Sequence, residues 1–392
     1  MNGLSGNYEI DTTTGEAVRA FVPNPLPPDL PPDPSSKLAR LHEQALLACG
    51  RLDAIGALLP EPDLFLYSYI RREAVLSSQI EGTQSSLSDL LLYELDGAPG
   101  VPFDDVEEVS GYVGALEHGI RRLQEGFPLC NRLLCEVHHR LLSHGRGADK
   151  QPGEFRRSQN WIGGTRPWNA HFVPPPPHRL PECMAALEKF LNEQEPSSSP
   201  LTRAALAHVQ FETIHPFLDG NGRVGRLLIS LMLHHEGVLA RPLLYLSLYF
   251  KQHRTQYYQL LDAVRREGAW GEWLEFFYTG VVETATLAVS TARRLQALFH
   301  EDAVRLNAKG RGGATLARTF DLLRATPLVS IQNLTPRLGV SFPTASRAVE
   351  ALVHLGILRE ITGRQRDRVF VYDRYLSILA EGTEPPFHPP NG

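Results

Sequence analysis

The sequence predicts a mainly α-helical protein with one small β-hairpin and a separate small domain near its C-terminus. Between residues 37 and 298 most segments carry apolar residues at helical spacing. One stretch, residues 145–181, loses this period and is rich in aromatic residues, glycine and proline. After a glycine-rich break at residues 307–313, the pattern changes to short helices followed by two strands. A chain of 392 residues is long enough for two or three domains.

The composition is that of a soluble globular protein, with 42% hydrophobic and 21% charged residues. A net charge of -5 argues against nucleic-acid binding by the whole protein, although a local basic patch is compatible with it. The four cysteines have no metal-ligand spacing, which favours a reduced, cytosolic state. We see neither a signal peptide nor a run of about 18 apolar residues, so we expect a cytoplasmic protein without membrane contact.

The first 36 residues end in the proline-rich run PNPLPPDLPPDPSS. Proline is excluded from helix interiors, so we expect an extended, polyproline-like arm lying over the body. The apolar spacing that follows predicts helices at residues 37–56, 64–78, 86–94, 106–124, 129–142, 181–195, 202–214, 245–267 and 270–298. His138 and His139 are adjacent and so point to different helix faces, which favours structural roles over a shared metal.

The stretch without helical period contains PGEFRRSQNWIGGTRPWNAHFVPPPP. Aromatic and β-branched residues on both sides of Gly163 and Gly164 predict a β-hairpin. Pro174 to Pro177 would stiffen the exit from this hairpin.

The C-terminal region reads as helices at residues 316–324, 330–338 and 343–355 and strands at residues 357–361 and 369–372. This order resembles a winged helix-turn-helix, with residues 343–353 in the place of the recognition helix. Residues 311–375 hold ten arginines, no lysine and five acids, so this region is basic while the rest of the chain is acidic. Thr344, Ser346 and Arg347 offer only a thin base-reading surface, and winged helices also serve as dimerisation or docking modules. DNA binding and a homodimer therefore both stay open.

The segment with the most chemistry is residues 214–228, IHPFLDGNGRVGRLL. Gly220 and Gly222 lack a Cβ, which allows a tight turn and a close approach to a ligand. The apolar helix that follows would place free N–H groups at a helix N-terminus, which is an anion site. Arg223 and Arg226 lie one helical turn apart and can face the same phosphate tail.

Two further groups in this segment suit a nucleotide triphosphate. Asp219 offers the hard oxygen that Mg²⁺ prefers. His215 can accept a proton near neutral pH. A plain turn between two helices has no use for an acid and two arginines, so the set predicts a polyphosphate site.

The same segment resembles a family signature, the Fic motif HPFx(D/E)GNGRxxR, at every specified position. The resemblance implies a helical Fic fold that transfers AMP from ATP to a Ser, Thr or Tyr hydroxyl of a protein, itself included, and releases pyrophosphate. It implies four parts: the proline-rich arm (1–36), an N-terminal helical segment (37–105), the Fic catalytic domain (106–306) and the winged-helix domain (314–380).

Residue by residue, the resemblance makes His215 the general base and Asp219 the ligand of Mg²⁺. The N–H groups of residues 220–222, with the side chains of Asn221 and Arg223, would stabilise negative charge during transfer. The nucleotide contacts implied by the motif are Asp219, Gly220, Asn221, Gly222, Arg223, Val224, Gly225 and Arg226. Family members also place groups near the base and ribose where Tyr257, Tyr258 and Arg265 stand, although either tyrosine could equally be core.

A second, shorter resemblance lies on the N-terminal side. Ser77, Glu81 and Gly82 match the inhibitory motif (S/T)xxxE(G/N) of such proteins. There the glutamate pairs with the second arginine of the signature, here Arg226, and blocks the γ-phosphate. We therefore expect Glu81 to be a brake on the site.

The predicted hairpin resembles the Fic flap, which holds a target segment by strand addition, so we expect a target protein at about residues 160–173. Two other functions use the same sequence. One is a DNA-binding regulator in which the Fic domain senses nucleotide. The other is removal of AMP, with Glu81 positioning water, and sequence alone does not separate the two directions.

Overall fold

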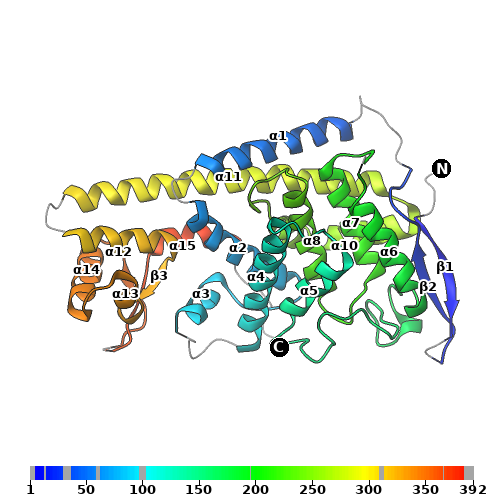
Figure 1. Ribbon diagram of the computed structural model, residues 1–392, viewed down its shortest axis with the longest axis horizontal. Helices are drawn as coiled ribbons and strands as arrows, with labels where there is room; N and C mark the ends of the chain where they lie inside the picture. The colour runs from blue at the N-terminus through cyan, green and yellow to red at the C-terminus, as the bar shows by residue number, and fades with distance from the viewer. Residues whose placement is uncertain are drawn as a thin grey trace, which may run out of the picture. The chain divides into compact units, whose positions relative to one another are not determined.

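The computed structural model describes residues 5–12, 15–29, 37–58, 62–96, 103–194, 196–308, 313–364 and 366–383. Helices dominate, which confirms the predicted fold class, and the strands form two small antiparallel sheets (Figure 1). The chain packs as two compact units, Met1–Asp53 with Ser110–Ala285 and Ala54–Val109 with Thr286–Gly392. Helices α1 (Lys37–Leu58), α4 (Phe103–Gln124) and α11 (Trp270–Ala308) contribute residues to both units.

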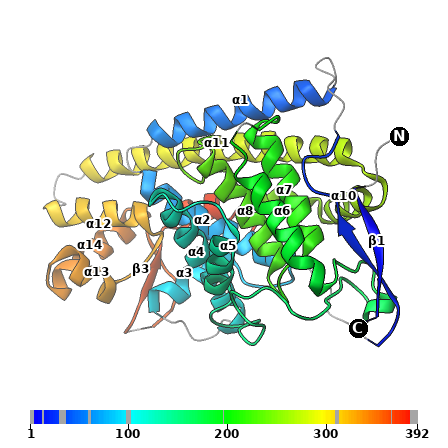
Figure 2. The same cartoon turned by 45° about the vertical axis from the view of Figure 1, so that its right-hand side comes forward.

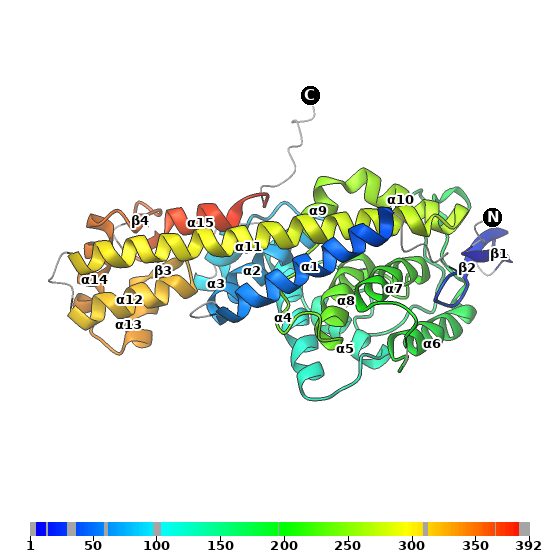
Figure 3. The ribbon, with the colours of Figure 1, turned by 90° about the horizontal axis from the view of Figure 1, so that it is seen from above.

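The first unit is built around α7 (Pro200–Ile214) and α8 (Asn221–His235), which lie side by side in Figures 1 and 3. Ser199 caps α7 by accepting a hydrogen bond from the Thr202 N–H, and Pro200 takes the first helical position. After Pro200 every residue of α7 is buried, which explains why its sequence is apolar on all sides. Around this pair lie α5 (Asn131–Leu141), α6 (Leu180–Leu191), α9 (Ser247–Gln252) and α10 (Arg254–Glu267), and Figure 2 shows α6 beside α7.

The single helix expected over residues 245–267 is wrong, because the chain breaks it at His253. This residue has φ -108° and ψ 33°, outside the helical region. Its ring packs 4.4 Å from that of Tyr249, and the change of direction brings Phe250 and Tyr257 into a stack with ring centroids 4.6 Å apart. The break thus serves the aromatic core.

The expected polyproline-like arm is also wrong over much of its length, because β1 (Gly6–Asp11) and β2 (Val18–Pro23) pair as an antiparallel hairpin. The first proline, Pro23, is the last residue of β2, so no proline interrupts the pairing inside either strand. Strand β2 also contacts residue 173, far along the chain, because the Phe21 N–H donates to the Val173 main-chain oxygen at 2.9 Å. Residues 30–36 of the predicted arm lie outside the described residues.

The hairpin expected around Gly163 and Gly164 is present only as one bridge, between Ile162 and Phe172. Both glycines have positive φ, 68° and 70°, and curl the chain out of strand geometry. Asn169 then accepts hydrogen bonds from two main-chain N–H groups of the loop at 3.0 and 3.1 Å, and the short 3₁₀ turn Pro167–Asn169 closes it. A second 3₁₀ turn, Pro177–Arg179, leads into α6. We call residues 160–173 the flap.

The second unit contains the three helices and two strands that the sequence predicts after residue 313, together with the strand Leu328–Ser330 and the helix Asp373–Ala380, which it does not predict. Its helices are α2 (Pro62–Ile80), α3 (Leu87–Asp96), α12 (Gly313–Ala325), α13 (Ile331–Leu338), α14 (Phe342–His354) and α15 (Asp373–Ala380). Its strands β3 (Leu328–Ser330), β4 (Arg359–Glu360) and β5 (Val369–Val371) pair in the order β3-β5-β4. Gly339, with φ 65°, makes the left-handed turn between α13 and α14.

Helix α2 is fastened to the last residues of the chain within this unit. Ser68 Oγ lies 3.0 Å from the Tyr375 hydroxyl, and an Arg72 Nη donates to the Glu381 oxygen at 2.8 Å. Gln79 Nε2 donates to the Thr383 oxygen at 2.8 Å. The three α2 side chains are buried, as are Tyr375 and Thr383, so the hydrogen bonds tie one face of α2 to residues 375–383.

Candidate functional site

His215 stands at the C-terminus of α7, where its backbone turns into the left-handed region with φ 51° and ψ 60°. Pro216 follows, and a residue before proline is disfavoured in the right-handed helical region, so α7 has to end here. The His215 N–H still donates to the Phe211 oxygen at 2.9 Å. The helix therefore delivers the imidazole at a fixed position on its end.

Arg156, just before the flap, and Asn160, its first residue, both bind the same turn. Arg156 Nε donates to the His215 oxygen at 2.9 Å, and the Arg156 N–H donates to the Pro216 oxygen at 2.9 Å. Asn160 Nδ2 donates to the His215 oxygen at 3.2 Å and to the Phe217 oxygen at 2.9 Å. Burial lowers the pKa of Arg156 to about 10, still far above neutral pH, so it stays a cation. Neither residue is identifiable from the sequence, because their partners are main-chain oxygens more than 50 residues away.

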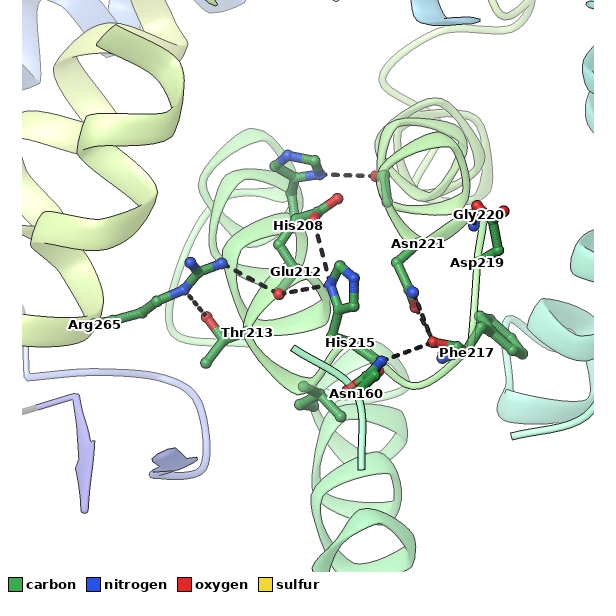
Figure 4. A network of polar contacts seen from close by, with 12 residues as sticks. Asn160, His208, Glu212, Thr213, His215, Phe217, Asp219, Gly220, Asn221 and Arg265 are labelled. Atoms are coloured by element: carbon green, nitrogen blue, oxygen red, sulfur yellow. Dashed lines mark hydrogen bonds and ion pairs between the residues drawn. The ribbon is translucent and has the colours of Figure 1, made fainter. Parts of the chain in front are cut away.

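The orientation of the imidazole is set by Glu212, one turn earlier on α7 (Figure 4). His215 Nδ1 lies 3.3 Å from the Glu212 main-chain oxygen and 3.9 Å from Glu212 Oε2. A carbonyl oxygen only accepts, so we assign the proton to Nδ1. Nε2 is then the nitrogen that can take a proton from a substrate.

The loop after His215 is closed by Asn221. Its Oδ1 accepts from the Phe217 N–H at 2.9 Å, and its Nδ2 donates to the Phe217 oxygen at 2.8 Å. Asn221 therefore acts on the loop shape, with its amide committed to main chain. Gly220 has φ 76° and precedes the helix, a conformation that favours glycine.

The helix N-terminus at which we expect an anion site begins earlier than the apolar run predicts. Helix α8 starts at Asn221, so the N–H groups of Asn221, Gly222 and Arg223 form its first turn. The N–H that follows, on Val224, already bonds to the Gly220 oxygen at 3.0 Å. A negatively charged group is stabilised at such an end.

Both arginines of the motif lie inside α8, one turn apart, and both are buried. One Nη of Arg223 lies 3.4 Å from Asp219 Oδ1, and the Gly220 N–H donates to the same oxygen at 2.6 Å. Asp219 itself is about one-third exposed. A carboxylate oxygen thus faces solvent beside the helix end, at the place where the sequence predicts a metal ligand.

His138 supports this loop from α5. The His138 ring stacks on that of Phe217 with centroids 3.7 Å apart. Its Nε2 lies 3.0 Å from the main-chain oxygen of Asp219, and the Gly153 N–H donates to its Nδ1 at 2.8 Å. Burial lowers the pKa of His138 to about 4, so it is neutral. His139 is exposed while His138 is buried, which confirms that the two histidines lie on different helix faces.

Gly225 of α8 lies close against α7. A Cβ there would lie 2.6 Å from Glu212 Oε1 and 3.3 Å from the His208 ring. His208 is fully buried, with Nδ1 2.9 Å from the Gly225 oxygen and Nε2 2.8 Å from the Tyr257 hydroxyl. Burial lowers the pKa of His208 to about 3. Gly225 and the buried Val224 thus pack two helices together rather than face a ligand.

The structure favours the core alternative for Tyr257, which is only 1% exposed and packed among Phe250, Trp273 and His208. Its neighbour Tyr258 is 41% exposed.

Arg265, also buried, does not face open space either. It donates to Thr213 Oγ1 and the Glu212 oxygen, each at 3.2 Å, and lies 4.1 Å over the ring of Phe172. Arg265 therefore joins α10, the end of α7 and the flap.

The inhibitory-motif residues lie at the end of α2, in the second unit. Ser77 is buried within the helix, and Glu81 follows its last residue with its N–H donating to the Ser78 oxygen at 3.0 Å. Gly82 has φ 103°, a conformation that favours glycine. Glu81 thus stands in the turn that ends α2.

Among the residues that the structure describes, no three His, Cys, Asp or Glu side chains gather as a metal site. All four cysteines are free thiols, as the sequence predicts. In the same part of the chain, no helix is long and apolar enough to cross a bilayer.

Comparison with known proteins agrees with the motif. Residues 39–121 match the Fic/DOC family N-terminal model, and residues 128–233 match the Fic/DOC family model. Proteins described as "Protein adenylyltransferase Fic" from Drosophila grimshawi and Drosophila ananassae are 35% and 34% identical over 185 residues, which is 46% of this chain. The matched region is about a third of the length of these relatives, 35% and 34%.

A solved structure shares the fold. A Fic family protein from Desulfovibrio desulfuricans G20 superposes with a TM-score of 0.56 at 22% identity, covering 88% of this chain and 98% of that one.

Proposed function

We propose that this chain, which belongs to the Fic/DOC family, transfers AMP from ATP to a hydroxyl group of a protein and releases pyrophosphate. The observation that carries the proposal is the imidazole of His215, whose Nδ1 faces the Glu212 oxygen, in the same short segment as the anion-binding end of α8. A base that accepts at Nε2 and a cradle for phosphate are the two groups that phosphoryl or nucleotidyl transfer needs.

In the proposed reaction His215 Nε2 takes the proton of the target hydroxyl while the hydroxyl oxygen attacks the α-phosphorus of ATP. The bond from that phosphorus to the bridging oxygen breaks, and pyrophosphate leaves with the electron pair. The N–H groups at the start of α8 and the guanidinium of Arg223 stabilise the charge on the phosphate oxygens. Buried side chains hold these donors in place, so they need little reorganisation during the reaction.

The residues fit a magnesium ion shared with the phosphates. Asp219 binds the Gly220 N–H and Arg223 through Oδ1, and its carboxylate is partly exposed, so a second oxygen is available to a hard cation. Mg²⁺ commonly takes one or two carboxylates and completes its shell with phosphate oxygens and water, which suits a site with one protein ligand. When bound, the ion would neutralise phosphate charge.

We further propose that Glu81 restrains this activity by competing with the γ-phosphate for Arg226. Glu81 sits at a turn anchored by α2, and Arg226 is a buried cation on α8. One guanidinium cannot hold both a carboxylate and a phosphate in the same bidentate geometry. Loss of the carboxylate should therefore raise activity.

The target protein is proposed to dock on the flap by main-chain pairing. Ile162 and Phe172 make a single bridge, and the loop between them exposes Trp168. Short, incomplete pairing leaves main-chain groups available to an added strand, and an exposed indole adds apolar contact.

The test is labelling with ATP carrying the label on its α-phosphate, in the presence of Mg²⁺. We expect Glu81→Gly protein to label itself and proteins of a lysate more strongly than wild type, and His215→Ala in the same background to label nothing. Labelling that survives His215→Ala would refute the assignment of the base. A control with label on the γ-phosphate separates AMP transfer from phosphorylation, and mass spectrometry identifies the acceptor residues.

Removal of AMP would use the same residues. Incubating a purified AMP-modified target with wild-type protein in the absence of ATP distinguishes the two directions. Release of AMP that requires Glu81 would assign the chain to removal.

A second candidate function is DNA binding by the proposed winged helix. Arg347 on α14, and Arg364 and Arg366 between β4 and β5, are exposed basic side chains. A gel shift at physiological salt with random-sequence DNA tests it, because specific binding must survive the salt-dependent loss of phosphate contacts. A shift that disappears with Arg347→Ala would support this role.

A further inference from the structure

We propose that Glu212 is a positioning residue for His215: its buried carboxylate stabilises the imidazolium that forms when Nε2 takes a proton. This deepens the proposed function and rests on it. The carboxylate is outside the signature motif, since it lies three residues before the histidine.

The first support is position. Glu212 offers His215 Nδ1 two oxygens, the main-chain oxygen at 3.3 Å and Oε2 at 3.9 Å (Figure 4). The first fixes the tautomer, and the second places negative charge behind the ring. Both side chains are largely shielded from water, where a charge at this distance acts strongly.

The second support is the room made for the carboxylate. Gly225 is inside α8, where glycine costs about 1 kcal/mol relative to alanine. A Cβ there would lie 2.6 Å from Glu212 Oε1, closer than the two atoms can approach. Helix α8 thus has a glycine, despite its low helix propensity, at a position where a Cβ would clash with the Glu212 carboxylate.

The third support is charge. A lone buried carboxylate would take up a proton and lose its charge. Burial lowers the pKa of Arg265, and the nearby Glu212 carboxylate raises it. Arg265 also donates a hydrogen bond to the Glu212 main-chain oxygen. Arg226, next to Gly225, and Arg265 both act on the pKa of the buried His208 beside them. The guanidinium of Arg265 therefore favours a negative charge on Glu212.

The alternative is that Glu212 only balances Arg265. The charged groups around His215 are Glu212 on α7, Arg156 through the His215 oxygen, Asp219, Arg223 and Arg226 at the start of α8, and Arg265 through the Glu212 oxygen. The carboxylate of Glu212 lies 3.9 Å from His215 Nδ1, which places its charge at the imidazole itself. A structural role would therefore change stability and leave the titration of His215 where it is.

The deciding experiment follows the titration of His215 by NMR in protein with labelled histidine, with His215→Asn for assignment. In Glu212→Gln, which keeps shape and removes charge, we expect the midpoint to fall by about one pH unit. An unchanged midpoint overturns the proposal. This measurement does not depend on AMP transfer, so it separates the failure of this inference from the failure of the proposed function.

Kinetics supply the second arm, in the Glu81→Gly background. We expect Glu212→Gln to lower kcat about 10- to 100-fold with KM for ATP nearly unchanged, the range for groups that orient a histidine from behind. The acidic limb of the rate profile should move to lower pH with the NMR midpoint. Gly225→Ala, which displaces the carboxylate, should reproduce both effects.

A matched control neutralises a carboxylate that directly follows α8. Glu236 pairs with the buried Arg203 near the far end of that helix. Glu236→Gln should lower stability and leave kcat and the His215 midpoint as in the parent. A change in the midpoint in this control as large as that in Glu212→Gln would overturn the assignment to Glu212.

Discussion

Replacing Asn221 with alanine should damage the site through the loop and not through a lost ligand contact. The side chain is buried and makes both hydrogen bonds to the main chain of Phe217, at 2.9 and 2.8 Å. In Asn221→Ala the Phe217 oxygen keeps Asn160 as a donor. The Phe217 N–H loses its acceptor within a buried turn.

The magnitude follows from that difference. An orphaned buried N–H costs about 1–3 kcal/mol, and the second hydrogen bond adds about 1 kcal/mol, so we expect a loss of about 2–4 kcal/mol. For a unit of about 150–250 residues this corresponds to a fall in Tm of roughly 5–15 °C. A displaced Asp219 and helix end should lower the labelling rate by about 100-fold.

The matched control is Asn160→Ala, which also removes two hydrogen bonds from this turn. Here no main-chain group is orphaned, because Arg156 still binds the His215 oxygen and Asn221 still binds the Phe217 oxygen. We expect a loss of only about 0.5–1.5 kcal/mol. Thermal unfolding and labelling are measured on both variants. Equal losses, or a loss below about 0.5 kcal/mol for Asn221→Ala, would refute the reasoning.

Three further predictions concern the groups behind the site. Tyr257→Phe removes the hydrogen bond to His208, so we expect the free energy of unfolding to fall by about 1 kcal/mol and KM for ATP to stay unchanged. A tenfold rise in KM for ATP would show instead that Tyr257 contacts the nucleotide. The depressed pKa values of His208, about 3, and His138, about 4, mean that the unfolded chain binds protons as pH falls below 6.5 while the folded chain does not. Each of these two histidines should therefore lower the free energy of unfolding by about 1.4 kcal/mol for every pH unit between about pH 6 and 4.5. Measured by urea unfolding, the pH dependence of this free energy should be smaller by that amount in His208→Gln. Arg265→Lys loses the paired hydrogen bonds to Thr213 and Glu212 and the stacking of the guanidinium on Phe172. We therefore expect slower labelling of a target protein with little change in KM for ATP. A rise in KM for ATP without slower labelling would contradict this.

Local patterns carry most of the helices and, in the C-terminal region, every element except β3 and α15, because periodicity and turn residues act within a few positions. The start of α8 shows where they stop. Gly222 and Gly225 argue against helix by propensity, yet both lie in it, since tight packing of α8 on Glu212 and His208 outweighs propensity. The strand pair β1–β2 is missed for the opposite reason, because a proline-rich ending masks a short alternation before it.

The site divides in the same way. The signature supplies His215, Asp219 and the glycine turn, all within one short segment. Arg156 and Asn160 act through main-chain oxygens that are distant in sequence, so no local pattern marks them. Glu212 leaves one trace, a glycine in the middle of a helix ten or more residues later.

The fastening of α2 has a consequence for the order in which the chain matures during synthesis. Its hydrogen bonds to Tyr375, Glu381 and Thr383 span 307, 309 and 304 residues. Since a chain leaves the ribosome N-terminus first, residues 110–285 are complete while α2 still lacks these partners. The helix that carries Glu81 at its end therefore forms these hydrogen bonds only after the segment with His215 has been synthesised. The proposed inhibition by Glu81 would accordingly be established last.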